Sequence, residues 1–267
     1  MSRRNADSTD RANRFPDEGR TCMKEERTII VEGNAYSVMI SDSQETLLAA
    51  RAAGRVPVGL LGESSRDLSA ARYLIETPEA ADDRFLERVV RRELGLPWNI
   101  GSSDRLLIRE FTLSDLEKVP QEPEDQEADR VFRDRDLLES YIRGQYGFYE
   151  YGVWAVVRKT DGRIIGKAGI VGCEEQPEGE SGKPDRTEMQ MELGYHIFQS
   201  YRKRGYAEEA CRIILDYIQK EYDCPVCAVT LRSNTASRHL LEKLGFRTAD
   251  QRYNGSEPLH CRYVWYC

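Results

Sequence analysis

One short segment, Tyr201-Arg-Lys-Arg-Gly-Tyr-Ala207, constrains this chain more than any other part of its sequence. It follows a strand-like run at residues 189–198 and precedes an amphipathic pattern that predicts a helix from Tyr206 to Glu221. The segment therefore places small residues at a strand-to-helix turn, where the backbone can approach a ligand closely. The N–H groups of a first helical turn have no partner within the helix and favour an anion. With the basic residues beside it, this turn predicts a pyrophosphate site.

A second strand–turn–helix pattern follows at a suitable distance along the chain. Residues 225–232 read as a strand, Asn234 is a good N-cap, and residues 235–244 read as a helix that ends before Gly245. The short pattern in the first turn is common by itself, so its significance depends on this structural context.

These segments resemble the GNAT superfamily of acetyl-CoA-dependent N-acetyltransferases, in particular the branch of ribosomal-protein N-terminal acetyltransferases. The resemblance extends over about residues 105–267. It implies an α/β fold of the GNAT kind, with a mixed, mostly antiparallel sheet flanked by helices, and acetyl-CoA as co-substrate. The matching segments are residues 106–111, 166–171, 192–195 leading to 202–207, and 234–237 leading to 243–246.

The resemblance also implies which residues contact the cofactor. In this family the strand before the phosphate turn polarises the thioester carbonyl through a backbone amide, and an asparagine contacts the pantetheine arm. Plain core packing of the strand side chains is compatible with that role, because the contacts would be made by backbone. The expected cofactor-binding residues are Tyr195, His196, Ile197, Lys203, Arg204, Gly205, Tyr206, Ala207, Glu208 and Asn234.

Glu192 is the candidate general base, because a partly desolvated carboxylate on the strand leading into the site would have a raised pKa suited to take an amine proton. The alternative is an ordinary strand-face carboxylate paired with an arginine. Glu188 has the same strand parity and is the second candidate. His196 is the obvious titratable residue, but a lone histidine on a strand is more often structural.

The residue that donates a proton to the leaving thiolate departs from the family's pattern. Many relatives place a tyrosine seven residues after the asparagine, and that position is Leu241 here. Ser237, in the first turn of the same predicted helix, is the substitute by resemblance to the ribosomal-protein branch. A hydrogen bond from Ser237 to nearby backbone explains that residue equally well.

The chain is expected to divide into a disordered tail at residues 1–26, a small parallel α/β domain at 27–96, a linker at 97–104 and the acetyltransferase domain at 105–267. The small domain is similar to a fragment of the HAD-type phosphatase core, through residues 39–46 and 49–58. That family requires two aspartates two residues apart, whereas Asp42 is followed by Gln44. We therefore expect a catalytically inactive unit that regulates, recognises the acceptor or forms a homodimer.

Composition and charge exclude several classes of protein. A net charge of −7 argues against general nucleic-acid binding, and no apolar run approaches the length of a membrane helix. The first ten residues have no apolar segment typical of a signal peptide. Seven scattered cysteines favour free thiols in a cytoplasmic protein, and the lone pair Cys224 and Cys227 enters a predicted strand, so we expect no metal.

The acceptor is expected to be a protein N-terminus or a small-molecule amine, attacked directly without a covalent enzyme intermediate. The acidic segment 121–129 and the start of a predicted helix at 133–139 fall where this family shapes its acceptor site. A negative rim there would attract a cationic amine, although a charged run is usually a solvated face. Because the tyrosine is replaced at Leu241, a non-catalytic acyl-CoA-binding sensor is the alternative function.

Overall fold

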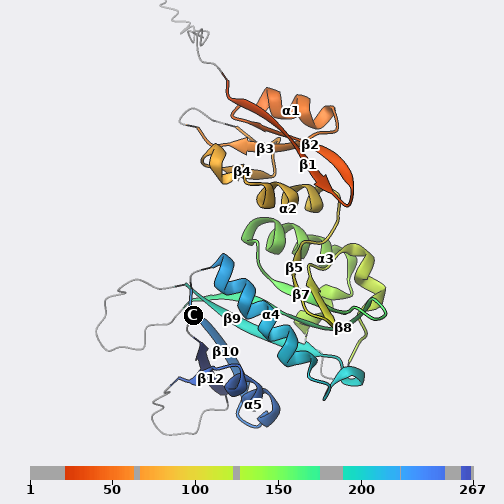
Figure 1. Ribbon diagram of the computed structural model, residues 1–267, viewed down its shortest axis with the longest axis vertical. Coiled ribbons are helices and arrows are strands. Elements are labelled where there is room, and N and C mark those ends of the chain that lie inside the picture. The colour runs from red at the N-terminus through yellow and green to blue at the C-terminus, as the bar shows by residue number, and fades with distance from the viewer. Residues whose placement is uncertain are drawn as a thin grey trace, which may run out of the picture. The chain divides into compact units, whose positions relative to one another are not determined.

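The computed structural model describes residues 22–62, 67–122, 127–174, 189–222, 224–249 and 260–265, and its chain divides into two compact units between Val90 and Arg91. The elements of the first unit are drawn in Figure 1. They are β1 (Lys24–Val31), β2 (Asn34–Ser41), α1 (Gln44–Ala52), β3 (Val56–Leu60), β4 (Tyr73–Ile75), a short 3₁₀ turn (Pro78–Ala80) and α2 (Asp83–Glu93).

The first unit is a four-stranded sheet in the order β1-β2-β3-β4. The parallel pairing expected from the sequence is present between β2 and β3 and between β3 and β4. Strand β1 differs, because it pairs with β2 as an antiparallel hairpin. The reason lies in the two-residue turn: Glu32 and Gly33 both have positive φ, the backbone of a tight hairpin that matches the twist of the strands.

The caps of α1 follow the sequence signals. The side chain of Ser43 accepts a hydrogen bond from the backbone N–H of Thr46, and Gly54 just past the helix has a φ of 74°. Asp42 accepts hydrogen bonds from the backbone N–H of Met23, at 2.9 Å, and from the thiol of Cys22, at 3.1 Å. Asp42 therefore fastens the start of β1 to the end of β2.

Two segments differ from the expected division of the chain. Strand β1 begins at Lys24, inside the expected tail, because the hairpin register extends to the pair Lys24–Ser41 and Glu26 bonds to Ser37 across the two strands. Residues 97–104, expected to be a linker, contain the strand β5 (Asn99–Ser102), which pairs with the second sheet. The sequence signal was weak there because a four-residue edge strand shows almost no periodicity.

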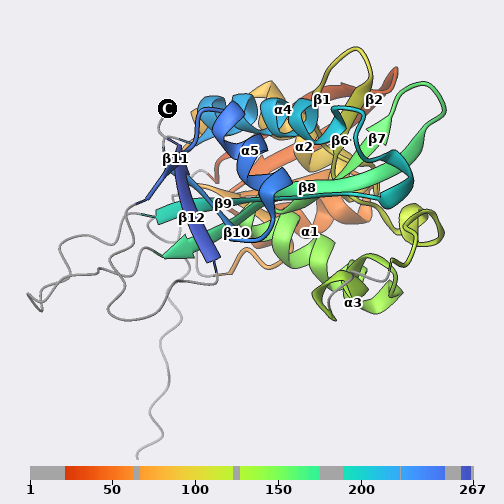
Figure 2. The same ribbon diagram turned by 90° about the horizontal axis from the view of Figure 1, so that it is seen from below.

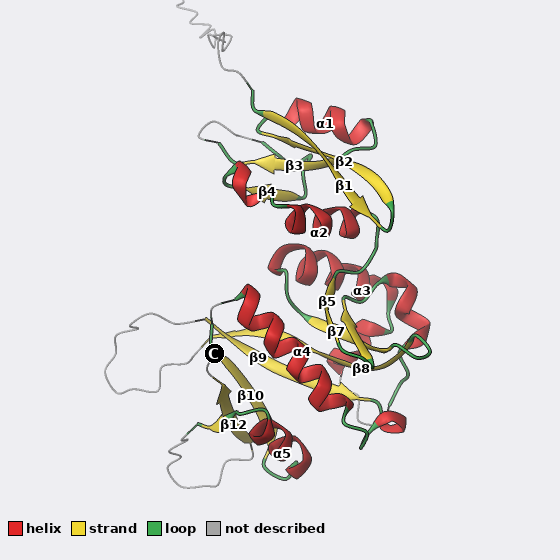
Figure 3. Ribbon diagram, viewed as in Figure 1, coloured by secondary structure: helices red, strands yellow, loops and turns green. Residues whose placement is uncertain are grey.

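The second unit is an eight-stranded sheet in the order β11-β12-β10-β9-β8-β7-β6-β5. Among the described strands of this second sheet, only the pair β9–β10 is parallel, so the mixed, mostly antiparallel sheet expected from the sequence is confirmed. Figure 3 shows its strands and helices by colour. The further strands are β6 (Leu106–Arg109), β7 (Val153–Arg158), β8 (Arg163–Glu174), β9 (Met189–Ile197), β10 (Val226–Leu231), β11 (Arg247–Thr248) and β12 (His260–Trp265).

Helices cover both faces of this sheet, with α4 on one side of β8 and β9 and α3 on the other (Figure 2). Helix α4 buries an apolar stripe that includes Ala210, Ile214 and Ile218, each with no exposed surface. The buried apolar side chains of this unit form one continuous core, and Trp154 is the largest of those that are fully buried. The helical elements are the 3₁₀ segments η2 (Leu113–Lys118), η3 (Glu127–Phe132) and η5 (Gln199–Tyr201), with α3 (Arg135–Tyr141), the π-helical η4 (Ile142–Tyr149), α4 (Tyr206–Glu221) and α5 (Thr235–Lys243).

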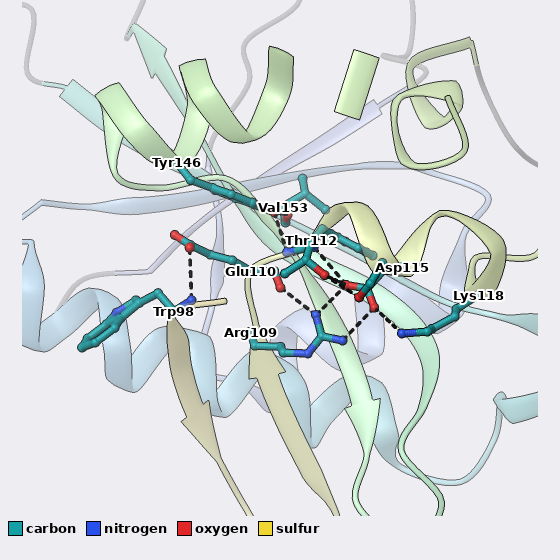
Figure 4. Close-up of polar contacts among 10 residues, drawn as sticks. Trp98, Arg109, Glu110, Thr112, Asp115, Lys118, Tyr146 and Val153 are labelled. Atoms are coloured by element: carbon teal, nitrogen blue, oxygen red, sulfur yellow. Dashed lines mark hydrogen bonds and ion pairs between the residues drawn. The ribbon is translucent and has the colours of Figure 1, made fainter. Parts of the chain in front are cut away.

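A buried polar network fixes the segment after β6 to the sheet (Figure 4). The guanidinium of Arg109 donates two hydrogen bonds to the carboxylate of Asp115, at 2.7 and 2.9 Å, and the backbone N–H of Thr112 donates a third at 2.9 Å. The neighbouring Glu110 accepts from the side chain of Arg92 at 2.6 Å and from the backbone N–H of Trp98 at 3.1 Å. These contacts hold η2 in place ahead of the loop that reaches the site described next.

Candidate functional site

The turn between β9 and α4 has the backbone that an anion cradle requires. Lys203 and Gly205 have φ values of 60° and 80°, and both belong to the left-handed region that favours glycine. Such a conformation is unusual for a lysine and marks a loop whose shape is imposed by its surroundings. Turns of this kind direct successive backbone N–H groups toward one side, which is the geometry of an anion-binding nest.

The first turn of α4 supplies further donors. Its N-cap is Gly205, which has no side chain to accept from the first-turn N–H groups, and no described side chain caps this end. The N–H groups of Tyr206, Ala207 and Glu208 are therefore available to a ligand, with the positive end of the helix dipole behind them. Lys203 and Arg204 are exposed beside them and add positive charge.

The acidic residues of this turn are already paired with cations. Glu208 accepts from Lys243 at 2.6 Å and from Arg212 at 3.1 Å, and these partners, Lys243 first, lower the pKa of Glu208. Glu209 accepts from Arg105, and the same arginine lies over the ring of Tyr206 at 4.7 Å. Because both carboxylates are neutralised locally, they do not cancel the attraction of this turn for an anion.

The opposite wall comes from the second strand–turn–helix unit. Asn234 is the N-cap of α5, and its side-chain oxygen accepts from the backbone N–H of Ser237 at 3.1 Å. The prediction that Asn234 caps this helix is confirmed. Its expected contact with a pantetheine arm stays a prediction.

Strands β9 and β10 separate between these two walls. Among the described residues they pair only at Val226–Met191 and Cys227–Glu192. The backbone N–H of Met191 bonds toward β10, at the carbonyl of Pro225, whereas the N–H of Phe198 bonds toward β8. Because the direction alternates along a strand, the N–H groups of Tyr195 and Ile197 face the gap that β10 leaves.

A cavity of about 500 Å³ joins the end of β9 and the α4 turn to the start of α5. This volume lies within the usual range of small-molecule sites. Nine of the ten expected cofactor-binding residues line it, as does Ser237; Arg204 lies outside the lining. Of the further lining residues, Tyr201, Arg202 and Ala236 lie within the segments that the sequence singled out but were given no role, and Leu240 lies in the helix that follows. The full lining is Tyr195, His196, Ile197, Tyr201, Arg202, Lys203, Gly205, Tyr206, Ala207, Glu208, Asn234, Ala236, Ser237 and Leu240.

Glu192 precedes the gap on β9, where it is half-buried. Burial raises the pKa of its carboxyl group above the ordinary value, and the charge of Arg262 opposes that rise. Two residues further on, Gly194 is exposed, and a side-chain carbon placed there would meet no atom within 4 Å. Open space therefore lies next to Glu192 on the same face of the strand. The second candidate, Glu188, lies outside the described residues.

The side chain of His196 contacts the carboxylate of Glu122, a residue 74 positions away along the chain. Its Nε2 atom lies 2.8 Å from Glu122, whose other oxygen accepts from the backbone N–H of Gln199 at 2.6 Å. Arg202 also lies 3.6 Å from Glu122. Glu122 therefore fastens the segment after β6 to the loop after β9, which supports a structural role for His196.

The acidic segment expected at the acceptor rim is also internally paired where it is described. Besides the contacts of Glu122, Asp129 accepts from Lys167 at 2.5 Å, and the side chain of Lys167 is only 6% exposed. These two carboxylates brace the fold, which weakens the hypothesis that they attract an amine. The sequence offered no sign of either contact, because the partners are far apart along the chain.

A family model described as an acetyltransferase (GNAT) domain matches residues 105–247, more than half of the chain. An uncharacterised protein of Bacillus subtilis, YkkB, is 29% identical over 114 residues, which is 42% of this chain; the chain covers 59% of that protein.

Solved structures with a similar fold have low identity. A GnaT-family acetyltransferase described as putative, from Bordetella pertussis, is 22% identical with a TM-score of 0.46, over 61% of this chain and 97% of that one. The ribosomal-protein-S5-alanine acetyltransferase of Vibrio fischeri is 17% identical with a TM-score of 0.47, over 63% and 96%. No described helix is long and apolar enough to cross a membrane.

Proposed function

The chain belongs to the acetyltransferase (GNAT) domain family, and from that premise we propose that it transfers an acetyl group from acetyl-CoA to the nitrogen of a primary amine. The observation that carries the proposal is the cavity that joins the end of β9 to the uncapped N-terminus of α4 and to the start of α5. The partly desolvated carboxylate of Glu192 lies three residues before Tyr195 on the same strand. When bound, acetyl-CoA supplies an activated thioester.

The residues of the α4 turn fit a diphosphate. The N–H groups of Tyr206, Ala207 and Glu208 donate to its oxygens, and Lys203 and Arg204 neutralise its charge. Gly205 permits the close approach of the backbone, since its φ of 80° is strained for a residue with a side chain. These residues bind and orient the cofactor.

The part of β9 at and beyond its last pair with β10 supplies groups for the reaction. The N–H group of Tyr195 faces the gap and is a donor to a carbonyl oxygen that gains negative charge. Glu192 accepts a proton from the attacking amine, directly or through water, because its pKa is raised by burial. The sequence offers Ser237, which lines the cavity, as one candidate for the proton donor to the leaving sulfur.

The acceptor is an amine that reaches the open space over Gly194, either a protein N-terminus or a small molecule. The positions of Glu122 and Asp129 in internal ion pairs argue against a strongly negative entrance made by these two residues. A panel of acceptors is therefore the appropriate probe.

The rival function is an acyl-CoA sensor without turnover, and the observation that favours it is Leu241, 1% exposed, at the position of the family's tyrosine. Calorimetric titration with acetyl-CoA, paired with thiol release over peptides and small amines, separates the two. We expect binding and amine-dependent release. Binding without release on any amine would favour the sensor, and no binding would refute both.

The Gly205→Glu variant tests where acetyl-CoA binds, because it places a negatively charged side chain at the proposed anion site. We expect it to abolish binding of acetyl-CoA. The matched control is Gly54→Glu, since Gly54 also has a positive φ of 74° at a helix end but lies in the first unit. Equal loss of binding in both variants would mean that the effect is one of folding.

A further inference from the structure

The side chain of Tyr195 crosses from β9 toward α5. Its hydroxyl lies 3.4 Å from the backbone oxygen of Ser237, to which it donates a hydrogen bond. This distance is longer than a normal O–H···O bond, so the phenol proton is only weakly engaged. Tyr195 and Ser237 both line the cavity, so the phenol bridges its two walls.

The surroundings keep this hydroxyl in its protonated form. Burial raises the pKa of Tyr195 to about 12, and its contact with Ser237 opposes the rise. The titratable groups that face it from neighbouring elements are Cys211 on α4 and Tyr263 on β12, and both act in the same direction as burial. A phenol in this state is a donor at neutral pH.

The backbone N–H and the side-chain hydroxyl of Tyr195 can thus both act at the same end of the cavity. Its N–H faces the gap where a thioester carbonyl is expected, and its hydroxyl lies across that gap at α5. Leu241 is buried outside the lining and has no proton to give, whereas its neighbour Leu240 lines the cavity. In this chain the phenol is therefore on strand β9, instead of on helix α5 at the position of Leu241.

We propose that the Tyr195 hydroxyl donates a hydrogen bond and then a proton to the sulfur that leaves when the acetyl group is transferred, with the Ser237 carbonyl holding the phenol in place. The inference rests on the proposed function. In the reaction a C–N bond forms and the C–S bond breaks. The amine proton passes to Glu192, the sulfur takes the proton of Tyr195, and water returns one proton to the phenolate and removes the other from Glu192.

The first test compares two variants in steady-state kinetics. Tyr195→Phe removes only the hydroxyl, and we expect kcat to fall roughly 10- to 100-fold with the KM for acetyl-CoA little changed, the size expected for loss of one hydrogen bond to a charged group. Ser237→Ala keeps the backbone carbonyl and should retain most of kcat. A Ser237→Ala loss that matches or exceeds that of Tyr195→Phe would overturn the assignment.

Tyr263→Phe is the matched control for structural effects. Its hydroxyl accepts a hydrogen bond from α5, from Arg238 at 3.2 Å, but Tyr263 is not part of the cavity lining. We expect Tyr263→Phe to change the melting temperature without the loss of kcat. If both phenylalanine variants lose kcat equally, the role of Tyr195 is structural and the proposal fails.

A second readout needs no turnover. The ultraviolet absorbance of the thiolate, followed against pH, gives the pKa of the CoA thiol bound to the wild-type protein. A hydrogen bond from Tyr195 stabilises the thiolate, so this pKa should be lower when bound to wild type than when bound to Tyr195→Phe. Equal values in the two proteins would overturn the inference while CoA binding upholds the site. Absence of CoA binding in wild type would refute the proposed function itself.

Discussion

The buried carboxylate of Asp115 offers the sharpest quantitative test of what stabilises the second unit. This carboxylate has no exposed side-chain surface and accepts hydrogen bonds from Arg109, Thr112 and the half-exposed Lys118 (Figure 4). Burial alone would raise its pKa, but Arg109 and the other donors reverse that effect and hold the pKa at about 2, against an ordinary value of 3.8. The charged form therefore contributes to stability.

The size of that contribution follows from the shift. A difference of nearly two pKa units corresponds to about 2 kcal/mol of unfolding free energy. Asp115→Asn loses this and also places an amide donor near the guanidinium of Arg109, so we expect a total cost of about 3 kcal/mol at neutral pH. Because the folded pKa is depressed, the wild-type contribution is complete above the ordinary pKa of 3.8 and is lost as pH falls toward 2. The cost of the substitution should shrink in parallel.

Urea unfolding followed by tryptophan fluorescence measures this, because all three tryptophans, Trp98, Trp154 and Trp265, lie in the second unit. Asp161→Asn is the control, since Asp161 pairs with Arg158 at 2.6 Å near the surface, where solvent screens the pair. A cost below about 1 kcal/mol for Asp115→Asn, or one that stays constant from neutral pH to pH 3, would refute the reasoning.

Three other substitutions test the site. Glu192→Gln should lower kcat by roughly 10²- to 10⁴-fold. The same variant should raise the melting temperature at neutral pH, because a carboxyl whose pKa is raised by burial costs stability when ionised. The gain should shrink as pH falls below that raised pKa and vanish below the ordinary value of 4.5. Lys203→Gly should relieve the positive φ and stabilise the fold by about 1 kcal/mol, yet weaken acetyl-CoA binding in calorimetry through the lost charge. Gly205→Glu should abolish that binding, and retained affinity would mean that the cradle is misplaced.

The parts of the site that the sequence predicts are those set by local spacing. The turn at Gly205 and the cap at Asn234 depend on residues a few positions apart, so the pattern of small and polar residues was sufficient to find them. Each of these positions satisfies a backbone requirement that few residue types can meet.

The parts that the sequence does not predict are set by contacts between distant residues. Glu122 meets His196 from 74 positions away, and no periodicity signals such a pair. The helix expected to start within residues 133–139 begins at Arg135, ends as an α-helix at Tyr141 and continues as a π-helical turn to Tyr149. Within that turn the Tyr146 hydroxyl donates a hydrogen bond to the carbonyl of Val153. Tertiary contacts thus overrode the local helical pattern.

The early separation of β9 from β10 has a consequence for motion. Two amides of β9, those of Tyr195 and Ile197, face a gap instead of a neighbouring strand, so they are open to exchange with solvent deuterium. A bound molecule that bonds to them would act as the missing strand and slow that exchange. Since such a molecule binds only the folded chain, it also raises the melting temperature as its free concentration rises above its dissociation constant, and the protein would be least stable when its cofactor is scarce.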